Sequence, residues 1–246
     1  MVTIQVRQMS FSHIEAIIFD KDGTLQDSRD FLRHLAQKRS RLIDAQIPGV
    51  GEPLLMAFGI EEDTLNPLGL MAVGSQRENE IAAAAYIAET GIGWLESITI
   101  AREAFQEASE WLKKDAVPSP IFPGTVEVLK TLNQADLKLG ILSADSTESV
   151  KAFVEYYQLS PYIQLQMGAE ANLSKPDPAL FLQACDRLGV DPAATLMVGD
   201  APGDIQMAKT AGAAGCIGIC DPAYSHDLSS ADVVVTQLNQ IRIKSF

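Results

Sequence analysis

The sequence predicts an α/β protein in which a parallel sheet lies between two layers of helices and carries a separate helical insertion. Beyond residue 117, apolar strand-like runs alternate with helical patterns, which is typical of a parallel sheet covered on both faces. A further apolar run, residues 14–20, stands alone before a long helical stretch. A single buried strand needs partners. It should therefore join the later strands, and the helical stretch between them should be an inserted domain.

The composition fits a globular protein with one large domain or two smaller ones. The 246 residues are 47% hydrophobic, and the net charge of −13 argues against non-specific nucleic-acid binding. The first residues lack the basic-then-apolar order of a signal peptide, and no apolar run approaches the ~18 residues of a membrane span. We expect a cytoplasmic monomer or homodimer that binds neither nucleic acid nor membranes. Its three cysteines follow no disulfide spacing and should be buried thiols.

Apolar residues spaced three to four apart predict the helices that follow the first strand. These helices are expected at 31–43, 54–58, 75–89 and 93–114. Ser28 is the candidate N-cap of the first helix, and Ser75 with Glu78 forms a capping-box pattern at the third. No strand-like run occurs between these elements. We therefore expect an all-helical domain over residues 27–116.

The pattern changes after Pro118 and Pro120, where strands and helices begin to alternate. Strands are expected at 138–143, 163–167, 195–199, 216–219 and 233–235. Helices are expected at 125–132, 146–157, 178–188 and 205–211, with a short helix at the C-terminus. The α/β core should thus comprise residues 1–26 and 117–246.

The first candidate site residues follow the strand at 14–20. Asp20 and Asp22 are two residues apart and point the same way if the extended geometry persists. Gly23 lets the backbone turn and offer N–H groups to an anion, and Thr24 follows it. An aspartate at the end of a buried strand is a candidate nucleophile. The simpler interpretation is a polar strand-to-loop junction.

Two further patches suit phosphate binding. Ser143 ends a predicted strand, and Ala144 leads into a helix whose N-terminal N–H groups favour anions. Asp145 and Glu148 also resemble a capping box, so helix capping is the alternative here. Lys175 precedes a proline on a stiff loop, where a fixed ammonium would offset phosphoryl charge. A solvated surface lysine is the alternative for that position.

A fourth patch is rich in carboxylates. Asp200 follows an apolar strand, and Asp204 comes four residues later. Mg²⁺ sites use one or two such carboxylates with water and phosphate oxygens. The alternative for Asp204 is an acidic residue in the first turn of a helix. All four patches lie at the C-terminal ends of strands, so they should meet at one edge of the sheet.

These motifs resemble those of the haloacid dehalogenase superfamily of phosphoryl-transfer enzymes. The resemblance is to the branch with a helical cap inserted after the first strand, which includes phosphoglycolate phosphatases and β-phosphoglucomutase. It covers residues 14 to about 235 and is most specific between Ser174 and Gly212. It implies a three-layer, Rossmann-like core with an inserted all-helical cap.

The resemblance also implies a role for each motif residue. Asp20 would attack phosphorus and become an aspartyl phosphate, while Asp22 would protonate the leaving oxygen and then activate water. Mg²⁺ would be held by Asp20, the backbone carbonyl of Asp22, and Asp200, with Asp204 supporting the metal site or orienting Lys175. The transferring phosphoryl group would be bound by Ser143, Lys175 and the backbone at Gly23 and Ala144. The superfamily's dehalogenases lack the second aspartate of the first motif, so Asp22 favours phosphate chemistry.

Several positions depart from the family pattern or concern specificity. Lys21 replaces a small or apolar residue and should turn toward the polar edge of the core or toward the cap, and Ala201 replaces a Ser or Thr. In the cap, Arg77 resembles the cap-loop arginine of β-phosphoglucomutase and would contact a distal phosphate or carboxylate. Arg29 and Arg33 are further candidates for substrate specificity. A solvated arginine is the alternative at Arg77.

The leading interpretation is a Mg²⁺-dependent phosphatase acting on a small phosphorylated metabolite that is phosphoglycolate-like or sugar-phosphate-like. One alternative is a sugar-phosphate mutase, and another is a regulatory module that binds without turnover. The intact set of Asp20, Asp22, Ser143, Lys175 and Asp200 argues against a non-catalytic module. A phosphonate hydrolase would need a Schiff-base lysine, and no cap lysine is assigned to that role.

Overall fold

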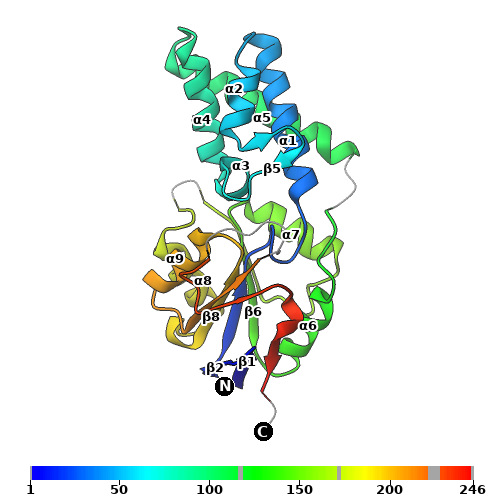
Figure 1. Cartoon of the computed structure of the whole chain (residues 1–246), viewed down its shortest axis with the longest axis vertical. Helices are drawn as coiled ribbons and strands as arrows, with labels where there is room; N and C mark the ends of the chain where they lie inside the picture. Colours follow the sequence, from blue (N-terminus) through cyan, green and yellow to red (C-terminus); the bar gives the residue numbers. More distant parts are fainter. Residues whose placement is uncertain (1, 116–118, 171–172, 221–227, 245–246) are drawn as a thin grey trace. The chain divides into compact units, whose positions relative to one another are not determined.

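The computed structural model describes residues 2–115, 119–170, 173–220 and 228–244, which form two compact units (Figure 1). The first unit comprises Met1–Asp27 and Ile121–Phe246, and the second comprises Ser28–Pro120. No helix among the described residues is both long and apolar enough to cross a lipid bilayer.

A six-stranded parallel sheet forms the centre of the first unit, which confirms the predicted fold class. Its strands run in the order β10-β9-β8-β3-β6-β7, so β3 is central although it is the first of them in the chain. The strands are β3 (Ala16–Phe19), β6 (Lys138–Leu142), β7 (Leu165–Met167), β8 (Thr195–Gly199), β9 (Gly215–Ile219) and β10 (Val233–Val235).

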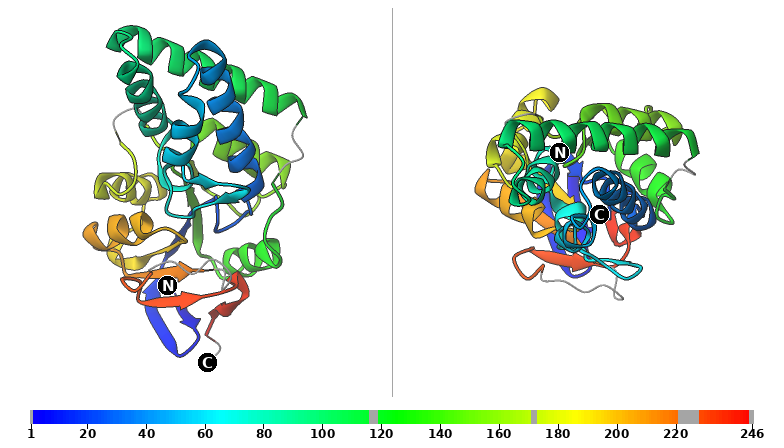
Figure 2. Two further views of the ribbon diagram at one scale, coloured as in Figure 1. Left: turned by 45° about the horizontal axis from the view of Figure 1, so that its top comes forward. Right: turned by 90° about the horizontal axis from the view of Figure 1, so that it is seen from above.

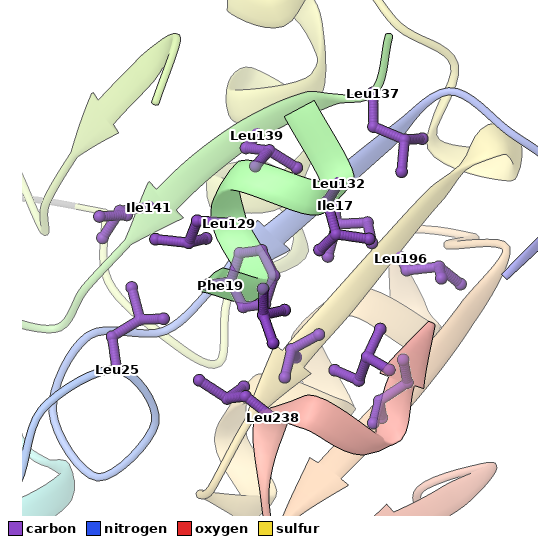
Figure 3. Packing of buried hydrophobic residues seen from close by; sticks show 14 of the residues in the cluster. Ile17, Phe19, Leu25, Leu129, Leu132, Leu137, Leu139, Ile141, Leu196 and Leu238 are labelled. Atoms are coloured by element: carbon purple, nitrogen blue, oxygen red, sulfur yellow. The ribbon is translucent and has the colours of Figure 1, made fainter. Parts of the chain in front are cut away.

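Helices cover both faces of this sheet, and the alternation of side chains along β3 explains how. Ile17 and Phe19 pack with Leu129 and Leu132 of helix α6 on one face (Figure 3). Ile18 points to the other face, into a cluster that includes side chains of α8 and α9. The helices of this unit are α6 (Thr125–Asn133), α7 (Thr147–Tyr156), α8 (Pro178–Leu188) and α9 (Pro202–Thr210), with a 3₁₀ turn at Pro192–Ala194. Strands β3, β8 and β9 are buried at every position, as expected for strands covered on both faces.

Both ends of the described chain meet in a small antiparallel sheet. Its order is β11-β1-β2, formed by β1 (Val2–Val6), β2 (Met9–Ile14) and β11 (Ile241–Ile243). The predicted C-terminal helix is therefore wrong, apart from a 3₁₀ turn at Leu238–Gln240. Ile241 and Ile243 pair with the backbone of β1, which a local sequence pattern does not reveal.

The second unit is built mainly from helices (Figure 2). Their buried side chains form one apolar core. They are α1 (Arg29–Gln46), α2 (Gly51–Ala57), α3 (Leu70–Val73), α4 (Gln76–Glu89) and α5 (Trp94–Asp115). Phe58 and Phe105 meet edge to face in this core, with ring centroids 6.1 Å apart. The capping box predicted at Ser75 is confirmed, whereas the Ser28 side chain makes no capping hydrogen bond.

The expectation of an all-helical insertion is wrong in one place. A short hairpin joins β4 (Ile60–Glu61) and β5 (Thr64–Leu65). Glu62 turns the chain with a φ of +52°. Two residues per strand are too few to produce a recognisable alternation in the sequence.

Candidate active site

Three of the predicted site residues directly follow three neighbouring strands. β3 lies between β6 and β8, and all three run parallel. Asp20 follows β3, Ser143 follows β6, and Asp200 follows β8. The N–H of Asp20 donates to the carbonyl of Val198 at 2.8 Å, which extends the pairing of β3 with β8 to the aspartate itself. The sheet therefore fixes the backbone from which the Asp20 carboxylate projects.

Lys175 comes from a later loop and bridges two buried carboxylates. Its Nζ donates to Oδ1 of Asp20 at 2.5 Å and forms an ion pair with Oδ1 of Asp204 at 2.6 Å. Burial disfavours the charged ammonium, but Asp20 and Asp204 outweigh this effect and raise the pKa of Lys175 above its ordinary value. A permanent positive charge is thus held against Asp20.

Asp20, Asp200 and Asp204 form a compact cluster of carboxylates. Each offers one oxygen, and these oxygens lie within 4.8 Å of one another. Burial raises the pKa of Asp20 to about 7, although the charge of Lys175 opposes this shift. Burial also raises the pKa of Asp200 well above its ordinary value, and the charges of Asp20 and Asp204 add to the effect. One ammonium does not neutralise three carboxylates, so this oxygen donor set fits a hard divalent cation.

Two glycines permit this crowding. Gly23 has a φ of +83°, and a Cβ atom at this position would overlap the carboxylate of Asp200. A Cβ atom on Gly199 would overlap the carboxylate of Asp204. The hydroxyl of Thr24 also donates to Oδ1 of Asp200, at 3.4 Å. The turn after β3 is therefore packed directly against the carboxylate that follows β8.

Asp22 lies outside this cluster and has a different set of partners. Its Oδ2 lies 2.9 Å from the Lys21 ammonium, and its Oδ1 accepts a hydrogen bond from the Gln26 amide at 2.7 Å. About one-fifth of its side chain is exposed, compared with 8% for Asp20. Two aspartates that are two residues apart in the sequence thus occupy distinct environments.

Ser143 is buried, and its neighbour Ala144 is partly exposed. The Ser143 hydroxyl oxygen accepts a hydrogen bond from the N–H of Asp145 at 3.1 Å, which does not use its own O–H hydrogen. The suggestion that Asp145 caps the next helix is wrong, because Ser146 caps α7 by accepting from the N–H of Ser149. Asp145 instead turns its Oδ2 to the Lys21 ammonium, at 3.1 Å.

The sequence did not predict the contacts around Asp22. The sequence predicts Lys21 at the polar edge of the core or toward the cap, and the structure pairs it with Asp22 and Asp145. The Gln26 amide binds Asp22 across a tight turn, and the only signal for it in the sequence is its position four residues after Asp22. The contact between Lys21 and Asp145 joins residues 124 positions apart, and no local pattern signals it.

The three arginines proposed for substrate specificity all lie in the second unit. Arg33 forms ion pairs with Asp30 and Asp63, each at 3.2 Å. Arg77 is exposed in the first turn of α4, and Arg29 is the partly exposed first residue of α1. Their role toward a substrate stays a prediction.

A parallel α/β core that gathers a buried lysine and clustered carboxylates at its strand ends has the arrangement of an α/β enzyme, with polar groups at the carboxyl ends of the strands. A family model described as haloacid dehalogenase-like hydrolase matches residues 14–212. The chain belongs to this family, which confirms the resemblance seen in the sequence.

Individual relatives match along nearly the whole chain. The chain is 37% identical over 239 residues to a probable phosphatase, IndB, of Dickeya dadantii, covering 92% of this chain and 90% of that protein. It is 27% identical over 239 residues to the phosphoglycolate phosphatase of Escherichia coli, covering 94% and 92%. These names agree with the prediction of a hydrolase of the phosphatase type.

Solved structures share the fold. A predicted phosphoglycolate phosphatase from Haemophilus somnus superimposes with a TM-score of 0.70 at 19% identity, covering 92% of this chain and 96% of that one. A β-phosphoglucomutase from Clostridium difficile gives a TM-score of 0.66 at 22% identity, with 92% of both chains covered. Both likenesses support the α/β architecture with its insertion.

Proposed function

We propose that the protein is a Mg²⁺-dependent phosphatase that hydrolyses a small phosphorylated metabolite through an aspartyl phosphate on Asp20. The observation that carries this proposal is the unequal environment of the two aspartates. Asp20 is buried against Lys175 and the other clustered carboxylates, while Asp22 is held outside that cluster by Lys21 and Gln26. In such a pair, one carboxylate can act as the nucleophile and the other can transfer protons.

In the first step, a carboxylate oxygen of Asp20 attacks phosphorus. A new P–O bond to Asp20 forms as the bond to the leaving oxygen breaks, and Asp22 in its protonated form gives that oxygen a proton. Lys175, fixed between Asp20 and Asp204, offsets negative charge on the transferring group. The proposed hydrogen-bond donors to the oxygens of the transferring phosphoryl group are the Ser143 hydroxyl and the backbone N–H groups at Gly23 and Ala144.

In the second step, the aspartyl phosphate is hydrolysed. Asp22, now a carboxylate, accepts a proton from water as the water oxygen attacks phosphorus, and the Asp20 carboxylate leaves. Asp22 regains its proton for the next cycle. Splitting a difficult displacement into two easier ones is the advantage of a covalent intermediate.

The clustered carboxylates are the proposed Mg²⁺ ligands. Asp20 and Asp200 would hold the ion together with the backbone carbonyl of Asp22, while Asp204 would support the site or hold Lys175. When bound, Mg²⁺ supplies positive charge beside the phosphoryl group. The raised pKa of Asp20 and of Asp200 supports this assignment, because both reflect buried negative charge that a cation would neutralise.

The proposed substrate class is a small phosphomonoester, such as phosphoglycolate or a sugar phosphate, and it rests on the names of the relatives. A screen of phosphorylated metabolites with Mg²⁺ tests it, with a generic aryl phosphate included. Asp20→Asn should abolish turnover. Turnover that survives this change would contradict the mechanism, and isomerisation of a sugar 1-phosphate would favour a mutase. The cytoplasmic location and the oligomeric state stay predictions.

A further inference from the structure

We propose that Lys21 is a positioning residue that fixes the carboxylate of Asp22 and ties it to the loop carrying Ser143. The proposal rests on the proposed function, in which Asp22 moves protons. It concerns a lysine that departs from the family pattern, and it assigns this lysine no contact with the substrate.

The environment of Lys21 leaves its ammonium fully occupied. Its Nζ lies 2.9 Å from Asp22 Oδ2, 3.1 Å from Asp145 Oδ2 and 3.3 Å from the Ser149 hydroxyl. An ammonium carries three N–H donors, and these acceptors account for all three. The Lys21 side chain is only 5% exposed. Lys21 is therefore a buried structural cation between two loops. A lysine that binds a phosphoryl group would need an N–H donor that has no acceptor within the protein.

The Asp22 carboxylate is held at both oxygens. Lys21 binds one of them, and Gln26, which is itself buried, donates to the other at 2.7 Å. The backbone of this loop is closed as well, because the Lys21 carbonyl accepts from the N–H groups of Leu25 at 2.9 Å and Gln26 at 3.1 Å. With both the backbone and the carboxylate restrained, Asp22 is held in one orientation, with its two oxygens bound by Lys21 and Gln26.

Lys21 also connects Asp22 to the loop after β6. Asp145, which binds the Lys21 ammonium, donates its own N–H to the Ser143 hydroxyl at 3.1 Å. Its other carboxylate oxygen accepts from the N–H of Ser146 at 2.7 Å, so the side chain is anchored. A continuous path from Asp22 through Lys21 and Asp145 to Ser143 thus joins the proposed proton donor to the proposed phosphate donor. Small displacements of such catalytic groups are costly, because a misplacement of about 1 Å can lower the rate by roughly a hundredfold.

The test compares kcat/KM for two substrates, because this ratio reports phosphoryl transfer to Asp20. An alkyl phosphate needs a proton from Asp22 for its leaving oxygen, whereas nitrophenyl phosphate needs much less help. Lys21→Met should lower kcat/KM by about tenfold or more for the alkyl phosphate and by less than about threefold for nitrophenyl phosphate. Lys138→Met is the matched control, because this lysine donates to the carbonyls of Leu188 and Gly189 instead. It should leave both ratios unchanged.

A double-mutant comparison separates positioning from a general structural effect. If Lys21 acts through Asp22, the double variant Lys21→Met/Asp22→Asn should be no slower than Asp22→Asn alone. If Lys21→Met gives no cooperative melting transition, Asp145→Asn takes its place. It weakens the anchor by replacing the carboxylate with an uncharged amide of similar shape, and it should show a loss of about threefold in kcat/KM with the same dependence on the leaving group.

Three results would overturn the inference while leaving the proposed function intact. One is an equal loss for both substrates, another is multiplication of the single losses in the double variant, and the third is unchanged kcat/KM in a folded Lys21→Met protein. Failure of the unaltered protein to turn over any phosphomonoester with Mg²⁺ would instead overturn the proposed function and this inference with it.

Discussion

The ammonium of Lys175 lies 2.6 Å from Oδ1 of Asp204, and both side chains are almost completely shielded from solvent. Asp204 sits in the first turn of α9, and its Oδ2 accepts from the N–H of Ala201 at 3.2 Å. The aspartate is therefore anchored to its own helix and presents a fixed oxygen to the lysine. This arrangement holds Lys175 in place for its contact with Asp20.

Lys175→Met should lower kcat/KM by roughly 10²–10³-fold, because it removes a fixed charge that would stabilise the transferring phosphoryl group. Steady-state kinetics on the best phosphomonoester measure the effect. Lys209→Met is the matched control, since Lys209 is half-exposed and pairs with Asp232, away from Asp20. Comparable losses in the two variants would contradict the role assigned to Lys175.

Gly23→Ala should reduce activity by at least about tenfold, because the new Cβ would displace the Asp200 carboxylate. Gly212→Ala provides a control with nearly the same backbone strain. Gly212 has a φ of +81°, close to the +83° of Gly23, but open space surrounds the position where its Cβ would lie. Both variants should lose about 1–2 kcal/mol of stability from the left-handed backbone, measured by urea unfolding. Only Gly23→Ala should also lose activity. Equal activities of the Gly23→Ala and Gly212→Ala proteins would refute the steric argument.

The proposed Mg²⁺ site predicts that Mg²⁺ stabilises the folded protein and that Asp200→Asn removes this stabilisation. A ligand that binds only the folded state contributes about 2.7 kcal/mol at a hundred times its Kd. The melting temperature of the unaltered protein should therefore be higher in excess Mg²⁺ than in chelator. The melting temperature of Asp200→Asn should be the same in both. In chelator, Asp200→Asn should melt no lower than the unaltered protein, because one of three crowded carboxylates is gone. Asp232→Asn should retain the Mg²⁺ response, and its loss there would argue against a site at Asp200.

Alkaline pH should destabilise the protein through its buried thiols. Burial raises the pKa of Cys185 to about 11, and burial together with the charge of Asp232 raises the pKa of Cys216 to about 12. The folded state then keeps protons that the unfolded state releases above about pH 9, so stability falls as pH rises through this range. Each cysteine should contribute about 1 kcal/mol to the loss between pH 8 and pH 10.

Urea unfolding of Cys216→Ala at both pH values checks this expectation. The difference between the two pH values should shrink in this variant, although its absolute stability falls at both because a cavity forms. Cys220→Ala is the control, because Cys220 is partly exposed. An unchanged pH difference in Cys216→Ala would contradict the assignment.

The sequence predicted the parts of this protein that depend on buried periodicity. The position of Asp20 and Asp200 at the ends of adjacent strands followed from apolar runs and from the rule that parallel strands end at one edge. The hairpin at β4 and β5 escaped prediction because its strands are two residues long. Strand β11 escaped because its partner, β1, lies at the opposite end of the chain.

The contacts between side chains were harder to predict than the positions of their backbones. The side chain of a lysine that follows Asp20 can turn in several directions, and the sequence does not show which acceptors are near. The pairing of Lys21 with Asp145 depends on how the turn after β3 packs against the loop after β6. The role of Asp145 was misjudged for the same reason, since a carboxylate before a helix normally suggests a cap.

The chain leaves and re-enters the first unit at adjacent points. Gln26 pairs with Ile121 in an antiparallel bridge, and the carbonyl of Leu25 accepts from the N–H of Phe122 at 3.0 Å. The core thus joins the two ends of the insertion through its own hydrogen bonds. An insertion of different length or architecture could be grafted between the same two residues without moving a strand. Exchange of the insertion at this junction would therefore leave the hydrogen-bonded core intact.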